Sequence, residues 1–431
     1  MTLRFQIVIL ISTAILFFTG CSDFFSSDKT SNSPQTPSAP SGQSLPEDLL
    51  HPNEGEFSEK KLLANLGLNV FAKQAQNLAV QVPALKYSLE AYCTALESGE
   101  EAVPQKSDVV RDWQRVMIAL HTIEGAPFGP YINRGRFIAD YLYSWPFLNT
   151  CGIDQNVYSW FHQQKPKAQE LFYNLRGLAA IEYLLFEDSL MSRCNIVAQP
   201  QMQQWNNQTT AQKKRQRCEW SLQLMTDIDE KAKILYSDWS TSGGHYTAQM
   251  VSAQIFTNEK EALNAITDAL SNIEKLKDLK LGRPLGRHKD CDDVSCAKDV
   301  EHIYSGFSLQ AGEAQLLGFK AIFFGSSSSS AKAFGFDDML IQHGRQDVVT
   351  RMDLALDKAI ASIKNAQNNG HLKDQIENMN PMDCKESTSD RRLVEICAVH
   401  ADIRDVAFIF KTEVLTALSL RAPPLQQGDN D

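Results

Sequence analysis

One acidic side chain interrupts an apolar stretch of this 431-residue sequence. Glu182 lies among Leu178, Ile181, Leu185 and Phe186, which recur at helical spacing. A carboxylate among apolar side chains is costly unless it is paired, protonated or bound to a cation. The pattern is equally compatible with a glutamate that reaches solvent beside the apolar face. The sequence therefore predicts a helix whose one carboxylate either has a partner or lies at the edge of the core.

A histidine and a second glutamate lie three residues apart, at His121 and Glu124. This spacing places both on one face of a helix. If that helix packs against the helix of Glu182, one imidazole and two carboxylates converge, a donor set that suits iron or zinc. A solvated His–Glu pair at a helix end is the alternative, because this spacing is common by chance. We interpret Glu182, Glu124 and His121 as candidate metal ligands.

The stretch around Glu182 resembles the signature of the imelysin family. The family motif is Gly-x-His-x-x-Glu. Its glutamate is usually part of an Ala-Ile-Glu-Tyr/Phe-Leu-Leu sequence. Gly177 and Glu182 match the motif, and Tyr183 and Leu184 continue it. The histidine position holds Ala179. The resemblance therefore includes the motif glutamate and lacks the motif histidine.

Other short segments resemble the same family. Trp113, followed by Phe128-Gly129-Pro130, matches a tryptophan that precedes a Phe-Gly-Pro sequence in imelysins. Glu124 corresponds to an acidic residue shortly before that sequence. Lys411 to Leu418 resembles the closing segment of the family. The resemblance extends over most of residues 60–420 with sparse motifs.

The resemblance implies a periplasmic helical protein of a family first described as metallopeptidases, in which the motif histidine and glutamate are the proposed metal ligands. With Ala179, Glu182 has no partner on its own helix, and hydrolytic zinc needs about three protein ligands and an open position. We therefore expect no enzyme. The resemblance implies instead a non-catalytic binding component of bacterial iron uptake, with iron or zinc as cofactor and envelope iron-uptake proteins as partners. A metallopeptidase and a metal-free scaffold or polysaccharide-binding lipoprotein are the alternatives.

Helical periodicity dominates the chain, and strand signals are nearly absent, so the predicted fold class is all-α. Residues 318–322 repeat the Gly, Ala and Ile of residues 177–181 in register, which indicates an internal duplication with Phe323 in place of the glutamate. We expect helical bundles over 58–242 and 243–422 and a tail over 423–431. The expected helices cover 58–89, with a kink or break at Pro83, and 109–123, 169–186, 218–236, 258–279, 307–325, 339–366 and 398–420.

The N-terminus has the features of a targeting segment. Arg4 precedes an apolar run over residues 7–18, which is shorter than the roughly 20 residues of a membrane-spanning helix. The run leads into Phe18-Thr19-Gly20-Cys21, which resembles a bacterial lipobox, so we expect Cys21 to become the acylated first residue after removal of residues 1–20. An ordinary secretory signal is the alternative.

The segment after the cysteine predicts how the folded part is held at the membrane. Ser22 follows Cys21 where Asp would resemble an inner-membrane retention signal, which favours the outer membrane of a Gram-negative cell. Residues 21–57 are rich in Ser and Pro and predict a flexible tether. The expected location is the periplasmic side of the envelope, with the membrane as a partner through the lipid on Cys21.

Charge and cysteine content agree with export. The net charge of −10, which becomes one unit more negative when Arg4 is removed, argues against nucleic acid as a partner. Eight cysteines remain beside Cys21, and an even number in an oxidising compartment indicates disulfides. Eight cysteines allow 105 pairings, so the sequence does not determine them. Proximity along the chain favours Cys291–Cys296, Cys384–Cys397 and Cys194–Cys218, with Cys93–Cys151 remaining.

Overall fold

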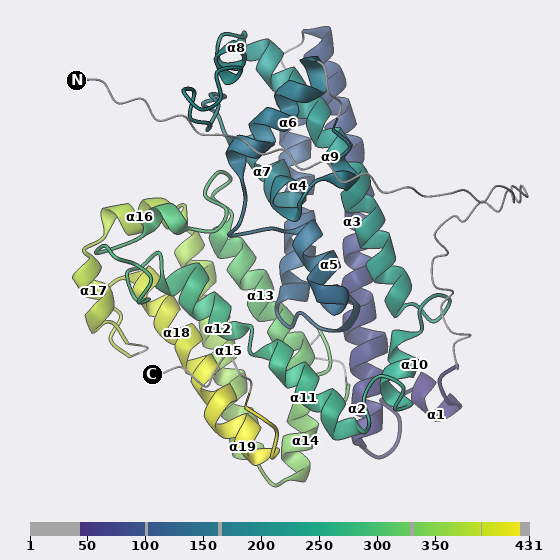
Figure 1. Ribbon diagram of the computed structural model, residues 1–431. Coiled ribbons are helices and arrows are strands. Elements are labelled where there is room, and N and C mark those ends of the chain that lie inside the picture. Colours follow the sequence, from purple (N-terminus) through teal and green to yellow (C-terminus); the bar gives the residue numbers. More distant parts are fainter. Residues whose placement is uncertain (1–43, 100–101, 163–165, 328–331, 389, 423–431) are drawn as a thin grey trace, which may run out of the picture. The chain divides into compact units, whose positions relative to one another are not determined.

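The computed structural model describes residues 44–422 apart from 100–101, 163–165, 328–331 and 389. Every regular element of these residues is a helix, as predicted (Figure 1). The signal peptide, Cys21 and most of the predicted tether lie outside the described residues, as does the predicted tail. In the described part, no helix is both long and apolar enough to cross a membrane.

The first group of helices packs around α3 (Ala72–Ser98). This helix continues α2 (Glu59–Asn65) and the π-helical η1 (Leu66–Phe71), and the hydroxyl of Ser58 caps the start of α2. It packs along α4 (Val103–Glu124) and α9 (Thr210–Trp239) (Figure 1). Pro83 lies inside α3 without ending it, so the prediction of a kink or break at this proline is wrong as regards the break.

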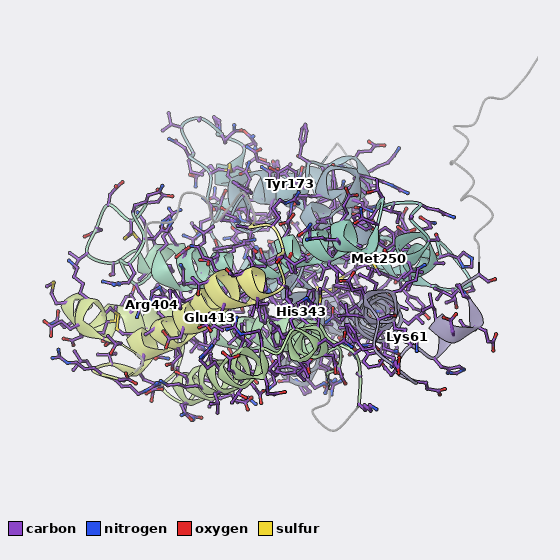
Figure 2. The ribbon with its side chains drawn as sticks, turned by 90° about the horizontal axis from the view of Figure 1, so that it is seen from below. Lys61, Tyr173, Met250, His343, Arg404 and Glu413 are labelled. Atoms are coloured by element: carbon purple, nitrogen blue, oxygen red, sulfur yellow. A yellow bond between two sulfur atoms is a disulfide. The ribbon has the colours of Figure 1, made fainter. Side chains whose placement is uncertain are left out.

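A second group of three helices packs together further along the chain. These are α13 (Ser308–Phe323), α15 (Gln346–Gln367) and α18 (Glu395–Ile409). The helix α18 continues through η7 (Phe410–Val414) into α19 (Leu415–Ala417), so Arg404 and Glu413 lie on one continuous helical segment (Figure 2). The boundary between domains at residues 242 and 243 stays a prediction.

The two groups meet where α13 crosses α4. Gly318 faces the backbone of α4, and a Cβ atom on it would lie only 2.0 Å from the carbonyl oxygen of Thr122. Glycine therefore allows a helix approach that no other residue would permit at this spacing. The contact holds the end of α4, which carries His121 and Glu124, firmly against α13.

The remaining helices are shorter and connect these groups. They are α1 (Glu47–Leu50), η2 (Gly129–Tyr131), α5 (Asn133–Leu142), α6 (Thr150–His162), η3 (Ala168–Glu170), η4 (Tyr173–Leu175), α7 (Leu178–Phe186), α8 (Met202–Asn206), α10 (Tyr246–Val251), α11 (Glu259–Leu270), α12 (Ile273–Lys275), η5 (Leu276–Gly282), η6 (Ala297–Asp299), α14 (Phe336–Gln342), α16 (Leu372–Asn378) and α17 (Pro381–Glu386).

Several predicted helix boundaries differ from the structure, three of them for a clear physical reason. The helix of Glu182 begins at Leu178 and not near residue 169, because Gly177 has a φ of +82° that a helix cannot include. The helix α9 begins earlier than predicted, since Thr209 and Gln212 form a capping box. The segment predicted as one helix over 339–366 is divided between α14 and α15 at Gly344, where φ is +70°.

Four disulfides tie the described residues together. Cys291–Cys296 and Cys384–Cys397 form as predicted. The other two predicted pairs are wrong, because Cys93 binds Cys218 and Cys151 binds Cys194. Cys93 lies on α3 and Cys218 on α9, so helix packing brings together two cysteines that are 125 residues apart in sequence.

Candidate functional site

Glu182 is a buried, fully engaged carboxylate on α7. Only 4% of the residue is exposed. Its Oε1 accepts hydrogen bonds from the backbone N–H of Ser305 at 3.1 Å and the hydroxyl of Ser305 at 2.9 Å. Its Oε2 lies 2.7 Å from Nδ1 of His302. The glutamate therefore has partners from a segment more than a hundred residues away and does not extend freely into solvent.

Two imidazoles connect Glu182 to Glu124. Nε2 of His302 lies 2.8 Å from Nε2 of His121, and Nδ1 of His121 lies 3.0 Å from Oε2 of Glu124. The structure thus brings the three predicted residues into one chain of contacts, with His302 inserted between His121 and Glu182. Both histidine side chains are completely buried.

A lysine, a third glutamate and a tyrosine complete the cluster. Nζ of Lys280 lies 2.9 Å from Oε2 of Glu124 and 3.1 Å from Oε1 of Glu301. The hydroxyl of Tyr143 donates to Oε1 of Glu301 at 2.9 Å and lies 3.2 Å from Nε2 of His302. Lys280 is part of the π-helix η5, an irregularity that often occurs at functional sites.

The charges of the cluster follow from burial and from Lys280. Burial acts to raise the pKa values of Glu124 and Glu301, but the ammonium of Lys280 and the neighbouring imidazoles together lower both. Burial acts to lower the pKa of Lys280, yet its two carboxylate partners raise it. The three side chains are therefore ionised together.

Burial and neighbouring charges shift the pKa values of the two histidines in opposite directions. Burial, assisted by Lys280, lowers the pKa of His121 and favours its neutral form. Burial also acts to lower the pKa of His302, but the adjacent Glu182 outweighs it and raises the value. With both Nδ1 atoms donating to carboxylates, the 2.8 Å contact between the Nε2 atoms requires one shared proton. An imidazolium at His302 that donates to His121 satisfies every one of these contacts.

His302 is held in place by its backbone and by aromatic rings. Its φ is +56°, in the left-handed region that L-residues seldom adopt. The ring of Trp113 meets it edge-on at 5.6 Å, and Phe307 lies 5.9 Å away on its own segment. The family-like Trp113 thus positions the imidazole.

The other residues that resemble family motifs shape the chain after the end of α4. Phe128, Gly129 and Pro130 follow the end of α4, and Gly129 has a φ of +60°. Phe128 packs against Phe71 and Trp239 at ring distances of 5.1 and 6.3 Å. This segment ends the helix of His121 and Glu124 without touching the cluster.

The donor set was tested for its fit to a metal ion. His121, Glu301 and His302 each offer one ligand atom, and these atoms lie within 4.8 Å of one another. Oε2 of Glu301 is buried and has no hydrogen-bond partner among the described residues. Two imidazoles and a carboxylate form a set that suits iron or zinc, and carboxylates on both outer nitrogens match the usual support of metal-bound histidines. The residues present therefore fit a metal ion.

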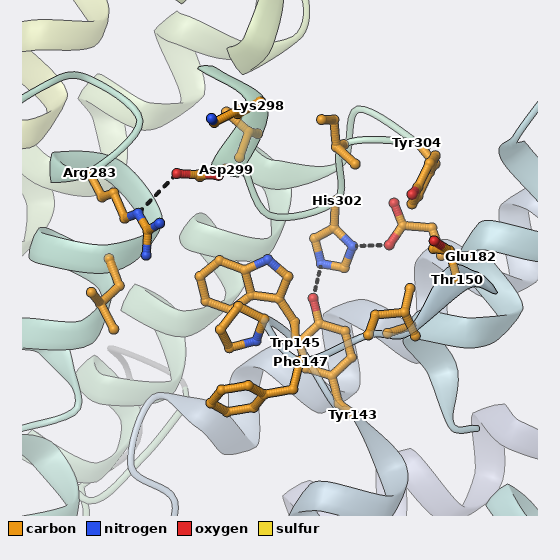
Figure 3. A pocket seen from close by; sticks show the side chains of 16 residues that line it. Tyr143, Trp145, Phe147, Thr150, Glu182, Arg283, Lys298, Asp299, His302 and Tyr304 are labelled. Carbon is orange, nitrogen blue, oxygen red and sulfur yellow. Dashed lines mark hydrogen bonds and ion pairs between the residues drawn. The ribbon is translucent and has the colours of Figure 1, made fainter. Parts of the chain in front are cut away.

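A cleft opens beside the buried cluster (Figure 3). Its volume is about 490 Å³, and residues from both predicted domains line it. Glu182, His302 and Ala179 are among the residues that line it. The site is therefore reached from solvent at the position where the family motif has a histidine.

Sequence reasoning missed four members of the cluster: Tyr143, Lys280, Glu301 and His302. Glu301 and His302 lie in a non-helical segment without any hydrophobic period, so only the adjacent Glu–His pair signals them. The assignment of Glu182, Glu124 and His121 as direct ligands stays a prediction.

These features define an all-helical protein with a buried imidazole–carboxylate network beside a cleft. The chain belongs to the imelysin family, whose model, named for imelysin and peptidase M75, matches residues 72–389. No curated protein matches it.

Two solved structures share the fold. One is described as an iron-regulated protein A precursor from Parabacteroides distasonis ATCC 8503, with 17% identity, a TM-score of 0.58, and coverage of 88% of this chain and 97% of the other. The second is an imelysin-like protein from Psychrobacter arcticum 273-4, with 12% identity, a TM-score of 0.56, and coverage of 85% and 98%.

Proposed function

We propose that this protein is a lipid-anchored, non-catalytic component of bacterial iron uptake that binds a metal ion in the cell envelope. The observation that carries the proposal is the facing pair of His121 and His302, together with an oxygen of Glu301 that has no hydrogen-bond partner in the described part of the chain. Family membership and the printed description of the Parabacteroides distasonis neighbour support the link to iron. Acylation of Cys21 would hold the protein at the outer membrane, where envelope iron-uptake proteins are its partners.

The ligands in this proposal are His121, His302 and Glu301. Glu124 and Glu182 orient the imidazoles through their Nδ1 atoms, which differs from the prediction that they bind the ion directly. The bound ion would supply positive charge where the shared proton now lies between the Nε2 atoms. Lys280 neutralises part of the negative charge of Glu124 and Glu301 and so limits the affinity.

The test is metal binding by isothermal titration calorimetry, with Fe²⁺ under anaerobic conditions and with Zn²⁺. We expect one ion per chain and a higher melting temperature, because a ligand of the native state stabilises it. Glu301→Gln should weaken binding about 100-fold. Glu274→Gln is the matched control, since Glu274 is also a buried glutamate paired with a lysine, Lys277, at 2.7 Å. No binding by the wild type, or equal losses in both variants, contradicts the site.

Two further measurements separate the alternatives. Metal-dependent cleavage of an unfolded protein substrate, abolished in Glu182→Gln, would establish a peptidase. Absence of any melting-temperature change with iron, zinc or copper would favour the metal-free scaffold. Cys21→Ala should release the protein from the membrane fraction, and a variant that stays there contradicts the lipid anchor.

A further inference from the structure

The cleft beside the cluster has a size that suits an organic ligand. Its volume of about 490 Å³ falls within the roughly 300–1,000 Å³ of small-molecule sites. A bare metal ion needs far less room. The walls come mainly from residues 143–150 and 298–304. The chemistry of these walls therefore says what else the site could accept.

Aromatic rings form much of the lining. Trp145 is partly buried, Phe147 is 65% exposed, and Tyr304 lies near Glu182 (Figure 3). Phe147 gains little from the core at this exposure. Rings left at a concave surface offer stacking and apolar contact to a flat molecule. The lining therefore favours a planar ligand.

Cations gather at the end of the cleft away from Glu182. Nε of Arg283 donates to Oδ2 of Asp299 at 3.0 Å, and Figure 3 shows the rest of the guanidinium turned toward Trp145. Lys298 is exposed and has no ion pair within the described residues. This end therefore favours an anionic group of the ligand.

Ala179 is one of the residues that line the cleft, together with Glu182 and His302. A histidine at this position would take up part of the space at this end. The departure from the family motif therefore leaves this end of the cleft open. This connects the missing imidazole with the presence of the cleft.

We propose that the cleft binds a small aromatic carboxylate, with its ring against Trp145 and Phe147 and its carboxylate at Arg283 and Lys298. The biological relevance of this ligand rests on the proposed function in iron uptake. An aromatic carboxylate with a neighbouring hydroxyl group also offers oxygen donors to iron. Binding itself depends on the cleft alone and does not require a metal.

Ligand titrations of the mature protein test the chemistry of the ring and of the charge. Salicylate and benzoate are compared with cyclohexanecarboxylate, which lacks the flat ring, and with benzyl alcohol, which lacks the charge. Calorimetry and saturation-transfer NMR, with and without EDTA, should show salicylate and benzoate binding at least tenfold more tightly. Equal binding of either comparison compound overturns the proposal.

Paired variants locate the binding. Arg283→Gln with Lys298→Gln should weaken salicylate binding at least tenfold, and Trp145→Leu should do the same. Arg287→Gln with Lys289→Gln removes equal charge from the same region outside the cleft and should change affinity less than twofold. An equal loss in this control overturns the assignment, and circular dichroism verifies that each variant folds.

The outcomes for metal and for salicylate are separable. Salicylate binding with no binding of Fe²⁺ or Zn²⁺ supports the cleft as a site for an aromatic carboxylate and rejects the proposed function. Metal binding with no salicylate binding rejects the proposed aromatic carboxylate ligand and leaves the proposal of a metal centre unaffected. Ala179→His changes the end of the cleft near Glu182, away from Arg283 and Lys298, so it should change salicylate affinity less than twofold, and a tenfold loss contradicts the proposed position of the ligand.

Discussion

Two stretches of similar sequence have different roles in this molecule. Residues 177–182 and 318–323 share Gly, Ala and Ile in register. Gly177 precedes α7 with a φ of +82°, so it is needed for its backbone conformation. Gly318 lies within α13, where it allows the close approach of Thr122 on α4. Glycine is therefore needed for a different physical reason at each of the two positions. The internal duplication stays a prediction.

The last residue of each stretch shows the difference in function. Glu182 binds Ser305 and His302 beside the cleft. Phe323 is completely buried and stacks on Phe319, with ring centres 6.5 Å apart. The first stretch builds a polar site and the second builds core, which shows that a shared helical pattern does not transfer a site.

Gly318→Ala should have the largest effect on this comparison. The added methyl would overlap the backbone oxygen of Thr122, which no side-chain rotation can relieve, so we expect a loss of about 5 kcal/mol and little folded protein at 37 °C. Gly177→Ala should cost less, about 3 kcal/mol, because the positive φ is accompanied by longer contacts, 2.7 and 2.8 Å, between the added Cβ and the backbone oxygens of Tyr141 and Leu142. Urea denaturation measures both, and the reverse order would contradict the assigned roles.

Phe323→Ala should cost about 3–5 kcal/mol, because it leaves a cavity in the core. Its affinity for metal should stay within twofold of the wild type, since the residue is not among those that surround the cluster. Denaturation and calorimetry on one preparation measure the two effects. A large loss of metal affinity in folded Phe323→Ala would mean that the second stretch also supports the site.

Asp337 provides a second, partly buried carboxylate for comparison with Glu182. Burial, together with the adjacent Asp338, raises the pKa of Asp337 to about 7, and the described residues give it no ion pair. Because the folded pKa lies above the unfolded one, the group lowers stability as the pH rises from about 4 to 7.

Asp337→Asn should remove this loss. Above pH 7 the variant should be about 2–4 kcal/mol more stable than the wild type, and at pH 4 the two should be equal. Melting temperatures across pH 4–8 measure the effect. Parallel curves for the two proteins would show that Asp337 ionises without cost.

Glu182→Gln should have the smallest effect on stability, about 1 kcal/mol, because glutamine keeps the size and can still accept from Ser305. The loss of the charge beside His302 should nevertheless weaken metal binding about 10- to 100-fold. Titration at constant pH measures this change. An affinity equal to that of the wild type would show that Glu182 has no role in orienting the imidazole.

The sequence contained enough to predict the all-helical fold and the importance of residues near Glu182. The apolar residues around Glu182 do form a helix, α7, although this helix is shorter than expected. The partners of Glu182 were not predictable, because His302 lies 120 residues away in a segment with no period. Lys280 was hidden for another reason, since a π-helix shifts side chains away from the register that helical patterns assume.

The left-handed backbone of His302 couples the metal centre to the wall of the cleft. A residue at a φ of +56° stores about 1–2 kcal/mol relative to an ordinary conformation, which its hydrogen bonds to His121 and Glu182 offset. The next two residues, Ile303 and Tyr304, line the cleft, so the buried imidazole and part of the cleft wall belong to one turn segment.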